Sequence, residues 1–242
     1  MTVPTPAKLP PQEKILPIHE TLLLAYGTPT WRAHHSPMDE LILTILSQHT
    51  SDVNSERAFR SLRAAYPTWE GVRDAPVAGV AAAIQSGGLA QVKAPRIQAV
   101  LRRIAETRGG VDLAFLDEMP LEEARAWLIA LPGVGPKTAA CVLLFACGRP
   151  ALPVDTHVHR LARRLGLVPD RATAEQTQLA LEALLPPEAY YAFHLNLIRH
   201  GREVCKAPRP LCERCPIRAW CVYYAAATAG VRPPTSAPEE AA

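Results

Sequence analysis

The stretch LPGVGPKT, residues 131–138, decides the fold, and it lies between two apolar segments. Glycines 133 and 135 flank Val134 and permit a very tight turn, because glycine adopts positive φ at little cost. Pro136 suits the first position of a following helix. Such a turn presents free backbone N–H groups at a helix N-terminus, which is a ready anion site. The stretch by itself fits either an ordinary turn between two helices or a hairpin that binds a DNA phosphate through Gly133, Val134 and Gly135. The basic and apolar segments on both sides favour the phosphate-binding hairpin.

Helical patterns surround this hairpin. Ser36 followed by Pro37 and an acid is a helix start, and apolar residues at helical spacing follow it. No stretch shows a convincing alternation of apolar and polar residues, which a half-buried strand would require. The fold class is therefore predicted to be all-α. Further helices are predicted over residues 51–65, 76–88, 94–107, 120–130 and 136–147.

Composition narrows the class of protein further. The longest apolar run, residues 139–147, falls well short of the roughly 20 residues that span a bilayer. The N-terminus lacks the apolar core of a signal peptide. A cytoplasmic protein without a membrane segment, associated with the nucleoid when it binds DNA, is expected.

The net charge is only +3, but the basic residues cluster along the chain. Such clusters can follow a phosphate backbone, although solvated helix faces give the same pattern. The three clusters lie at residues 93–108, 160–164 and 199–218.

Two residues form a candidate reactive pair. Lys137 falls in the first turn of the helix after the hairpin, where a cation opposes the helix dipole. Partial burial there would lower the pKa of its amine and leave more of the nucleophilic form. Asp155 follows 18 residues later and is predicted to cap the next helix. One helix and a short loop separate the two, which is about the path needed to bring Asp155 back beside Lys137.

Four of the six cysteines are closely spaced near the C-terminus, as Cys-x6-Cys-x2-Cys-x5-Cys. Four thiolates in one short loop suit a tetrahedral metal or an iron–sulfur cluster, and spacing alone leaves zinc open. Disulfides are not expected in a cytoplasmic chain. The candidate ligands are Cys205, Cys212, Cys215 and Cys221.

Residues 131–167, LPGVGPKTAACVLLFACGRPALPVDTHVHRLARRLGL, resemble the helix-hairpin-helix–Gly-Pro-Asp core of the endonuclease III family. The likeness extends from about Ser36 to Cys221. It implies a base-excision-repair DNA N-glycosylase with lyase activity on oxidised pyrimidines in double-stranded DNA. Lys137 would be the catalytic lysine and Asp155 the catalytic aspartate. The cysteine spacing is similar to that of the family's [4Fe–4S] loop, so the resemblance favours this cluster over zinc.

The resemblance also implies the chemistry. The damaged nucleotide is flipped out of the duplex into a pocket. The Lys137 amine attacks the sugar C1′ and displaces the base, and Asp155 helps to deprotonate the lysine and stabilises the developing positive charge. The resulting Schiff base permits β-elimination and a strand nick.

Two further segments resemble the family's DNA-reading edge, with departures. Leu89 would be the wedge that enters the duplex, and Lys93 would contact DNA beside it. The family glutamine that fills the gap left by the flipped base aligns with His49, and Gln48 stands one position early. The family often carries an aromatic residue after the leucine, where this chain has Ala90. These departures bear on substrate range and on the efficiency of base flipping.

The expected architecture has two helical domains on either side of a DNA-binding cleft. Residues 33–149 would form a six-helix barrel that ends with the hairpin. Residues 1–32 and 150–242 would form the cluster domain, with mobile proline-rich ends before residue 13 and after Gly230. Lys137 and Asp155 would lie at the mouth of the cleft. A monomer is the default expectation.

Alternative functions remain open from the sequence. The first is a glycosylase with a shifted preference for a mismatched or deaminated pyrimidine, which the His49 and Ala90 departures motivate. The second is a mainly abasic-site lyase. The third is a non-catalytic DNA-binding relative, which the presence of both Lys137 and Asp155 disfavours. An adenine mismatch glycosylase is disfavoured because such proteins usually lack a lysine here and carry a further domain.

Overall fold

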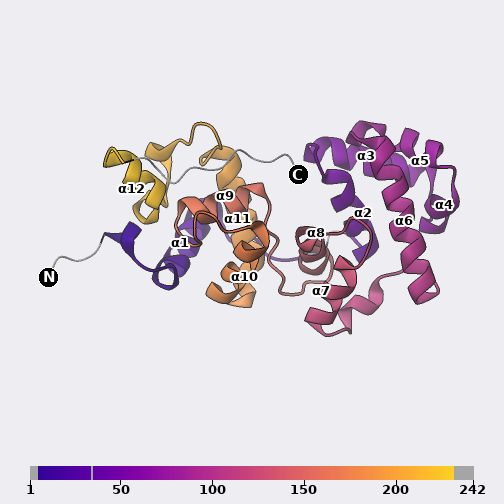
Figure 1. The fold of residues 1–242 in the computed structure, drawn as a ribbon, viewed down its shortest axis with the longest axis horizontal. Helices are drawn as coiled ribbons and strands as arrows, with labels where there is room; N and C mark the ends of the chain where they lie inside the picture. Colours follow the sequence, from indigo (N-terminus) through magenta and orange to yellow (C-terminus); the bar gives the residue numbers. More distant parts are fainter. Residues whose placement is uncertain (1–4, 34, 232–242) are drawn as a thin grey trace. The chain divides into compact units, whose positions relative to one another are not determined.

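The computed structural model describes residues 5–33 and 35–231, which are helical with no β-strand among them (Figure 1). The prediction of an all-α fold is therefore confirmed. Within these ranges no helix has the length and apolar character to cross a membrane. The described chain divides into two compact units, one of residues 32–149 and the other of residues 5–31 together with 150–231.

The unit of residues 32–149 contains the hairpin. Helix α6 packs against α4 and α5, and α2 packs against α3 and α8. Its helices are α2 (Pro37–Ser47), α3 (Asp52–Ala65), α4 (Trp69–Asp74), α5 (Val77–Ala83), η2 (Gln85–Gly87), α6 (Ala90–Arg108), η3 (Ala114–Asp117), α7 (Leu121–Ile129), α8 (Pro136–Cys141) and the π-helical η4 (Val142–Ala146).

The other unit contains the cysteine loop. Helix α11 packs against both α9 and α1, and α9 also contacts α10 and α12. Its helices are η1 (Pro6–Lys8), α1 (Pro11–Tyr26), α9 (Thr156–Arg164), α10 (Ala174–Leu184), η5 (Pro187–Ala189), α11 (Tyr190–Glu203), η6 (Cys212–Arg214), η7 (Arg218–Trp220) and α12 (Val222–Thr228).

Local sequence explains where the helices begin. The Ser36 hydroxyl accepts a hydrogen bond from the Asp39 N–H at 3.1 Å, and Pro37 occupies the first helical position of α2. Ser51 caps α3 in the same way. The apolar residues that α2 presents at helical spacing are fully buried, as their period predicts: Leu41, Ile42, Ile45 and Leu46.

Two expectations need correction. The single helix predicted over residues 136–147 changes from α8 to the π-helical η4 after Cys141. The prediction that the N-terminus is mobile is wrong for residues 6–12, because Pro6 begins η1, Ala7 is buried and Pro11 begins α1. Residues 1–4 and 232–242, for which mobility was also expected, lie outside the described residues.

Candidate functional site

The hairpin turn depends on one glycine more than on the other. Gly133 has φ +72°, a conformation that favours glycine, and a Cβ there would lie 2.6 Å from Cδ of Arg96, so this side chain would have to shift. Gly135 has φ −100°, which any residue adopts, so positive φ at both glycines was wrong. The N–H of the buried Val134 donates to the Leu131 carbonyl at 3.1 Å and closes the turn. Phosphate binding by the three turn residues stays a prediction.

Lys137 is the second residue of α8 and is half-buried. Its positive charge acts on Glu40, a half-buried carboxyl on the neighbouring helix α2. Burial raises the pKa of Glu40, while a hydrogen bond from the Thr44 hydroxyl at 3.1 Å and the charges of His35 and Lys137 oppose that rise. The structure thus adds a carboxyl near the lysine that no sequence pattern indicated.

Asp155 caps α9, as predicted. Its side chain is half-buried and accepts a hydrogen bond from the Val158 N–H at 2.8 Å. The preceding loop is held by His194, whose Nδ1 lies 2.9 Å from the Pro153 carbonyl oxygen. Lys137 belongs to the unit of residues 32–149 and Asp155 to the other unit. The catalytic pairing of the two therefore stays a prediction.

The two residues that were expected to read the duplex share a backbone feature. His49 has φ +54° and Leu89 has φ +50°, and no other described non-glycine residue has positive φ. Both side chains are exposed, and Leu89 is 54% exposed. Left-handed backbone at a bulky residue costs free energy and concentrates at functional sites. Gln48, which directly precedes His49, accepts a hydrogen bond from Arg96 Nη1 at 3.0 Å.

The expectation that Lys93 contacts DNA is corrected by its burial. The side chain is 2% exposed, and its amine donates to the carbonyls of Leu46 at 2.7 Å and Gly87 at 2.8 Å. Burial lowers the pKa of this amine. Lys93 therefore ties α6 to the ends of α2 and η2 and supports the Leu89 segment from inside.

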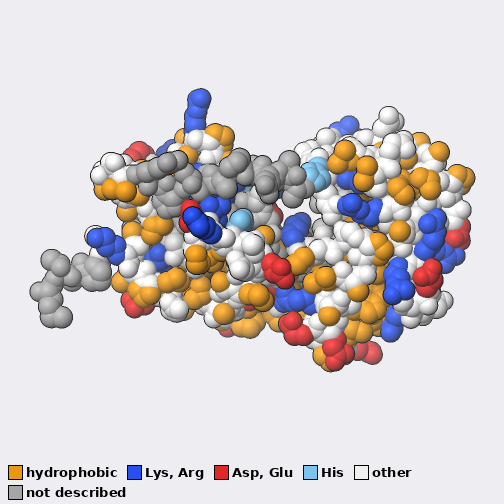
Figure 2. All heavy atoms as spheres, viewed as in Figure 1, with side chains coloured by type: hydrophobic (Ala, Val, Ile, Leu, Met, Phe, Trp, Pro, Cys, Tyr) orange, Lys and Arg blue, Asp and Glu red, His pale blue; other side chains and the backbone are white. Residues whose placement is uncertain are grey.

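The basic clusters are only partly surface features. Arg160 and Arg164 are buried and donate to backbone carbonyls, so the cluster at 160–164 is not a phosphate-binding surface. On the face drawn in Figure 2, Lys and Arg side chains are scattered among apolar and acidic ones.

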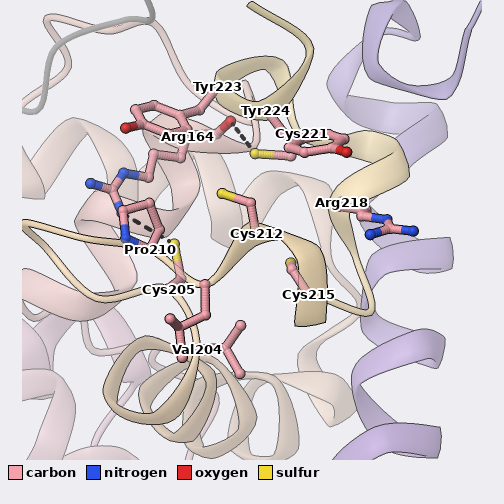
Figure 3. Close-up of a pocket in the computed structure, with 11 residues that line it drawn as sticks. Arg164, Val204, Cys205, Pro210, Cys212, Cys215, Arg218, Cys221, Tyr223 and Tyr224 are labelled. Carbon is pink, nitrogen blue, oxygen red and sulfur yellow. Dashed lines mark hydrogen bonds between the residues drawn. The ribbon is translucent and has the colours of Figure 1, made fainter. Parts of the chain in front are cut away.

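The four C-terminal cysteines surround one pocket, as Figure 3 shows. They come from the end of α11, from η6 and its flank, and from the start of α12. All four are free thiols. In the described part of the chain, no three Cys, His, Asp or Glu side chains are grouped as a single metal ion requires. Besides the cysteines, the pocket is lined by Arg164, Val204, Pro210, Leu211, Arg218, Tyr223 and Tyr224.

Burial in the pocket weakens the acidity of three of the thiols. Burial raises the pKa of Cys215 to about 12 and that of Cys221 to about 11, and it also raises the pKa of Cys212. Arg164 Nη1 lies 3.3 Å from the Cys205 sulfur, in hydrogen-bonding geometry (Figure 3). A cationic partner would favour the thiolate forms of Cys212, Cys215 and Cys221 against this effect of burial.

His200 lies beside the cysteine pocket. It is 1% exposed on α11, and its Nε2 lies 3.5 Å from the Cys215 sulfur. Its Nδ1 lies 2.8 Å from the Tyr26 hydroxyl, so it links the pocket to α1. Burial lowers the pKa of His200 to about 4. An isolated histidine in the sequence does not indicate a position beside a cysteine pocket.

Comparison with known proteins agrees with this arrangement. Residues 42–187 match the model of the HhH-GPD superfamily of base excision DNA repair proteins. Endonuclease III of Thermotoga maritima is 39% identical over 188 residues, which cover 78% of this chain and 84% of that protein. At3g47830 of Arabidopsis thaliana, named as a DNA glycosylase, is 40% identical over 167 residues, which cover 69% of this chain and 57% of that protein.

Two solved structures resemble the whole described fold. A non-covalent endonuclease III–DNA complex has a TM-score of 0.78 at 28% identity and covers 90% of this chain and 98% of that one. A trapped covalent endonuclease III–DNA intermediate has a TM-score of 0.75 at 29% identity and covers 87% of this chain and 95% of that one. The chain therefore belongs to the HhH-GPD superfamily of base excision DNA repair proteins, within the endonuclease III family.

Proposed function

We propose that the protein is a bifunctional DNA glycosylase and abasic-site lyase that removes oxidised pyrimidines from duplex DNA and acts as a monomer. The observation that carries the proposal is Lys137, a half-buried amine in the first turn after the hairpin. The likeness to an endonuclease III that was trapped covalently on DNA supports a nucleophilic role for it. The likeness to endonuclease III–DNA complexes supports duplex DNA as the partner.

In this proposal the flipped nucleotide meets Lys137, and its neutral amine forms a bond to C1′. The bond from C1′ to the base breaks, and its electron pair leaves with the base. The Asp155 carboxylate stabilises the positive charge that develops on the sugar. The nitrogen then loses a proton and its electron pair expels O4′ from C1′, which opens the sugar ring and leaves a Schiff base. Loss of a proton from C2′ of this Schiff base expels the 3′ phosphate by β-elimination.

His49 and Leu89 are proposed to contact the duplex. Both side chains are exposed and both residues have left-handed backbone. The buried amine of Lys93 donates to the carbonyls of Leu46 and Gly87 and so supports the backbone before each residue. Leu89 would enter the duplex as a wedge. His49 would lie where the extruded base leaves a gap. The left-handed backbone at both residues is then the energetic cost of directing their side chains toward DNA.

The cysteine pocket fits a [4Fe–4S] cluster by its donors. Four thiols from one short loop surround a common space, and an arginine N–H already points at one sulfur (Figure 3). Such a cluster occupies a volume rather than a point, and Cys205, Cys212, Cys215 and Cys221 would hold it. When bound, it would tie the basic loop between α11 and α12 into one shape. Because burial raises the pKa of Cys212, Cys215 and Cys221, binding of the cluster to these thiols must release protons.

A second candidate function is a glycosylase for a mismatched or deaminated pyrimidine. The observation that favours it is the pairing of Gln48 with Arg96, because this pairing leaves His49 rather than a free glutamine at the exposed position. An imidazole differs from a carboxamide in its hydrogen-bonding pattern toward the opposite base.

The first test is a nicking assay on duplexes that carry one thymine glycol, one uracil opposite guanine or one abasic site, with borohydride trapping in parallel. Wild type is expected to nick and to cross-link the thymine glycol duplex, and Lys137→Gln to do neither. Arg60→Gln, an exposed change on α3 outside the basic clusters, is the control for loss of positive charge. Trapping by Lys137→Gln would refute the nucleophile assignment. Faster processing of uracil than of thymine glycol would establish the second candidate.

A further inference from the structure

A lysine with no expected role lies beside the cysteine pocket. Lys14, on α1, is 1% exposed, and within the described chain its amine donates a single hydrogen bond, to the Leu165 carbonyl at 2.6 Å. Leu165 follows Arg164, whose carbonyl accepts a hydrogen bond from the Cys221 thiol at 3.2 Å. The ammonium and the thiol therefore contact adjacent carbonyls of one backbone segment at the end of α9.

The chain makes room for this amine. Gly166, the next residue, has φ +65°, and a Cβ there would lie 3.2 Å from Nζ of Lys14 and 2.9 Å from Cγ1 of Val222. An ammonium has three N–H donors, and burying it costs free energy unless an anion or several acceptors compensate. A single carbonyl is a weak compensation. The position of Lys14 is therefore explained better by a nearby negative charge than by the carbonyl alone.

A second buried cation faces the same pocket. Arg164 is 3% exposed, and its Nη1 lies 3.3 Å from the Cys205 sulfur (Figure 3). Neutral thiols give these two cations no charge partner, whereas metal-bound thiolates do. Burial lowers the pKa of Lys14, and a negative charge on Cys221 opposes that effect.

We propose that Lys14 is a charge partner of the iron–sulfur cluster: its buried ammonium stabilises the negatively charged, thiolate-bound cluster and raises its reduction potential. The inference rests on the cluster of the proposed function. Cluster potentials respond to net charge, hydrogen bonds and solvent exposure, and a buried charge is screened little by salt. Lys14 is in this view a positioning residue that is neither a ligand nor in contact with DNA.

The test uses full-length, iron-loaded protein and three variants. Lys14→Gln removes the charge but keeps an N–H donor for the Leu165 carbonyl, and Lys14→Arg keeps the charge. Lys8→Gln removes an exposed lysine from η1, in the same N-terminal segment, as the control. The measurements are the midpoint potential of the cluster by protein-film voltammetry, where the electrode supplies the electron, and the rate of iron loss to a chelator.

Lys14→Gln is expected to have a more negative potential and to lose iron several-fold faster, while Lys14→Arg and Lys8→Gln stay close to wild type. If Lys14→Gln cannot be loaded but Lys14→Arg can, the charge requirement is likewise supported. Equal potentials and equal iron loss in Lys14→Gln and wild type would overturn the proposal. So would failure of both Lys14 variants to load, since shape rather than charge would then matter. If purified wild-type protein contains no iron, the proposed cluster itself is refuted. This result is obtained before any variant is compared, so it is distinct from failure of the Lys14 proposal.

Discussion

Arg96 joins the hairpin to the segment that presents His49. Its Nη1 donates to Gln48 Oε1 at 3.0 Å, and its Cδ occupies the space that a side chain at Gly133 would need. One guanidinium from α6 therefore fixes the end of α2 and lies against the turn before α8. This contact connects the two parts of the unit that are proposed to touch DNA.

The two hairpin glycines should differ sharply on substitution. Gly133→Ala places a Cβ 2.6 Å from Arg96 on a left-handed backbone, whereas a Cβ at Gly135 would meet nothing within 4 Å. We expect Gly133→Ala to lower the free energy of unfolding by about 1–3 kcal/mol and Gly135→Ala by less than about 0.5 kcal/mol. Urea denaturation of both variants measures this. Equal losses would contradict the conformational argument.

Lys93 should matter for stability and not for phosphate binding. Lys93→Met leaves the carbonyls of Leu46 and Gly87 without their donor, so a loss of about 1–3 kcal/mol in unfolding free energy is expected. The salt dependence of DNA affinity should keep its slope, because no phosphate contact is lost. The exposed Arg103→Gln on the same helix should be stable. A smaller salt slope for Lys93→Met would restore Lys93 as a DNA contact.

Glu40 should give the stability a defined pH dependence. Burial raises its pKa in the folded state, so the native protein binds more protons at this group than the unfolded chain. The contribution of Glu40 to the free energy of unfolding is fully present below its pKa in the unfolded chain. It is lost as pH rises through the pKa of Glu40 in the folded protein. Glu40→Gln should therefore gain stability relative to wild type as pH rises from about 4 to about 8.

The control for Glu40 is Glu56→Gln, an exposed glutamate on α3 of the same unit. Its unfolding free energy should follow that of wild type throughout this pH range. The prediction for Glu40 fails if the difference between Glu40→Gln and wild type is the same at every pH, or if it falls as pH rises.

Two substitutions at Asp155 should separate capping from charge. Asp155→Ala removes the acceptor for the Val158 N–H and is expected to cost about 1 kcal/mol of stability. Asp155→Asn retains an acceptor and should be nearly as stable as wild type. Both lack the carboxylate, so both should lose glycosylase activity if it acts on the sugar or on Lys137. An active Asp155→Asn would restrict Asp155 to its structural role.

Much of the fold and part of the site follow from local sequence, because caps, periodicity and glycine conformation act over a few residues. Ser36 and Ser51 mark helix starts, Asp155 caps α9, and the apolar period of α2 predicts its buried face. The cysteine spacing likewise indicates a metal loop, because all its ligands come from one short segment.

Tertiary structure decided which cations are exposed and which titratable groups meet. Lys93 and Arg164 look like surface charges in the sequence, yet both are buried, because carbonyls from distant segments converge on them. Lys14, on α1, bonds the Leu165 carbonyl close to Cys221, and the charge of Lys137 acts on Glu40 of α2. These contacts join residues that are far apart in the chain. Local sequence patterns therefore do not predict them. Packing between helices therefore determined the electrostatics of the site, whereas the local sequence indicated the four candidate cysteine ligands and the hairpin turn.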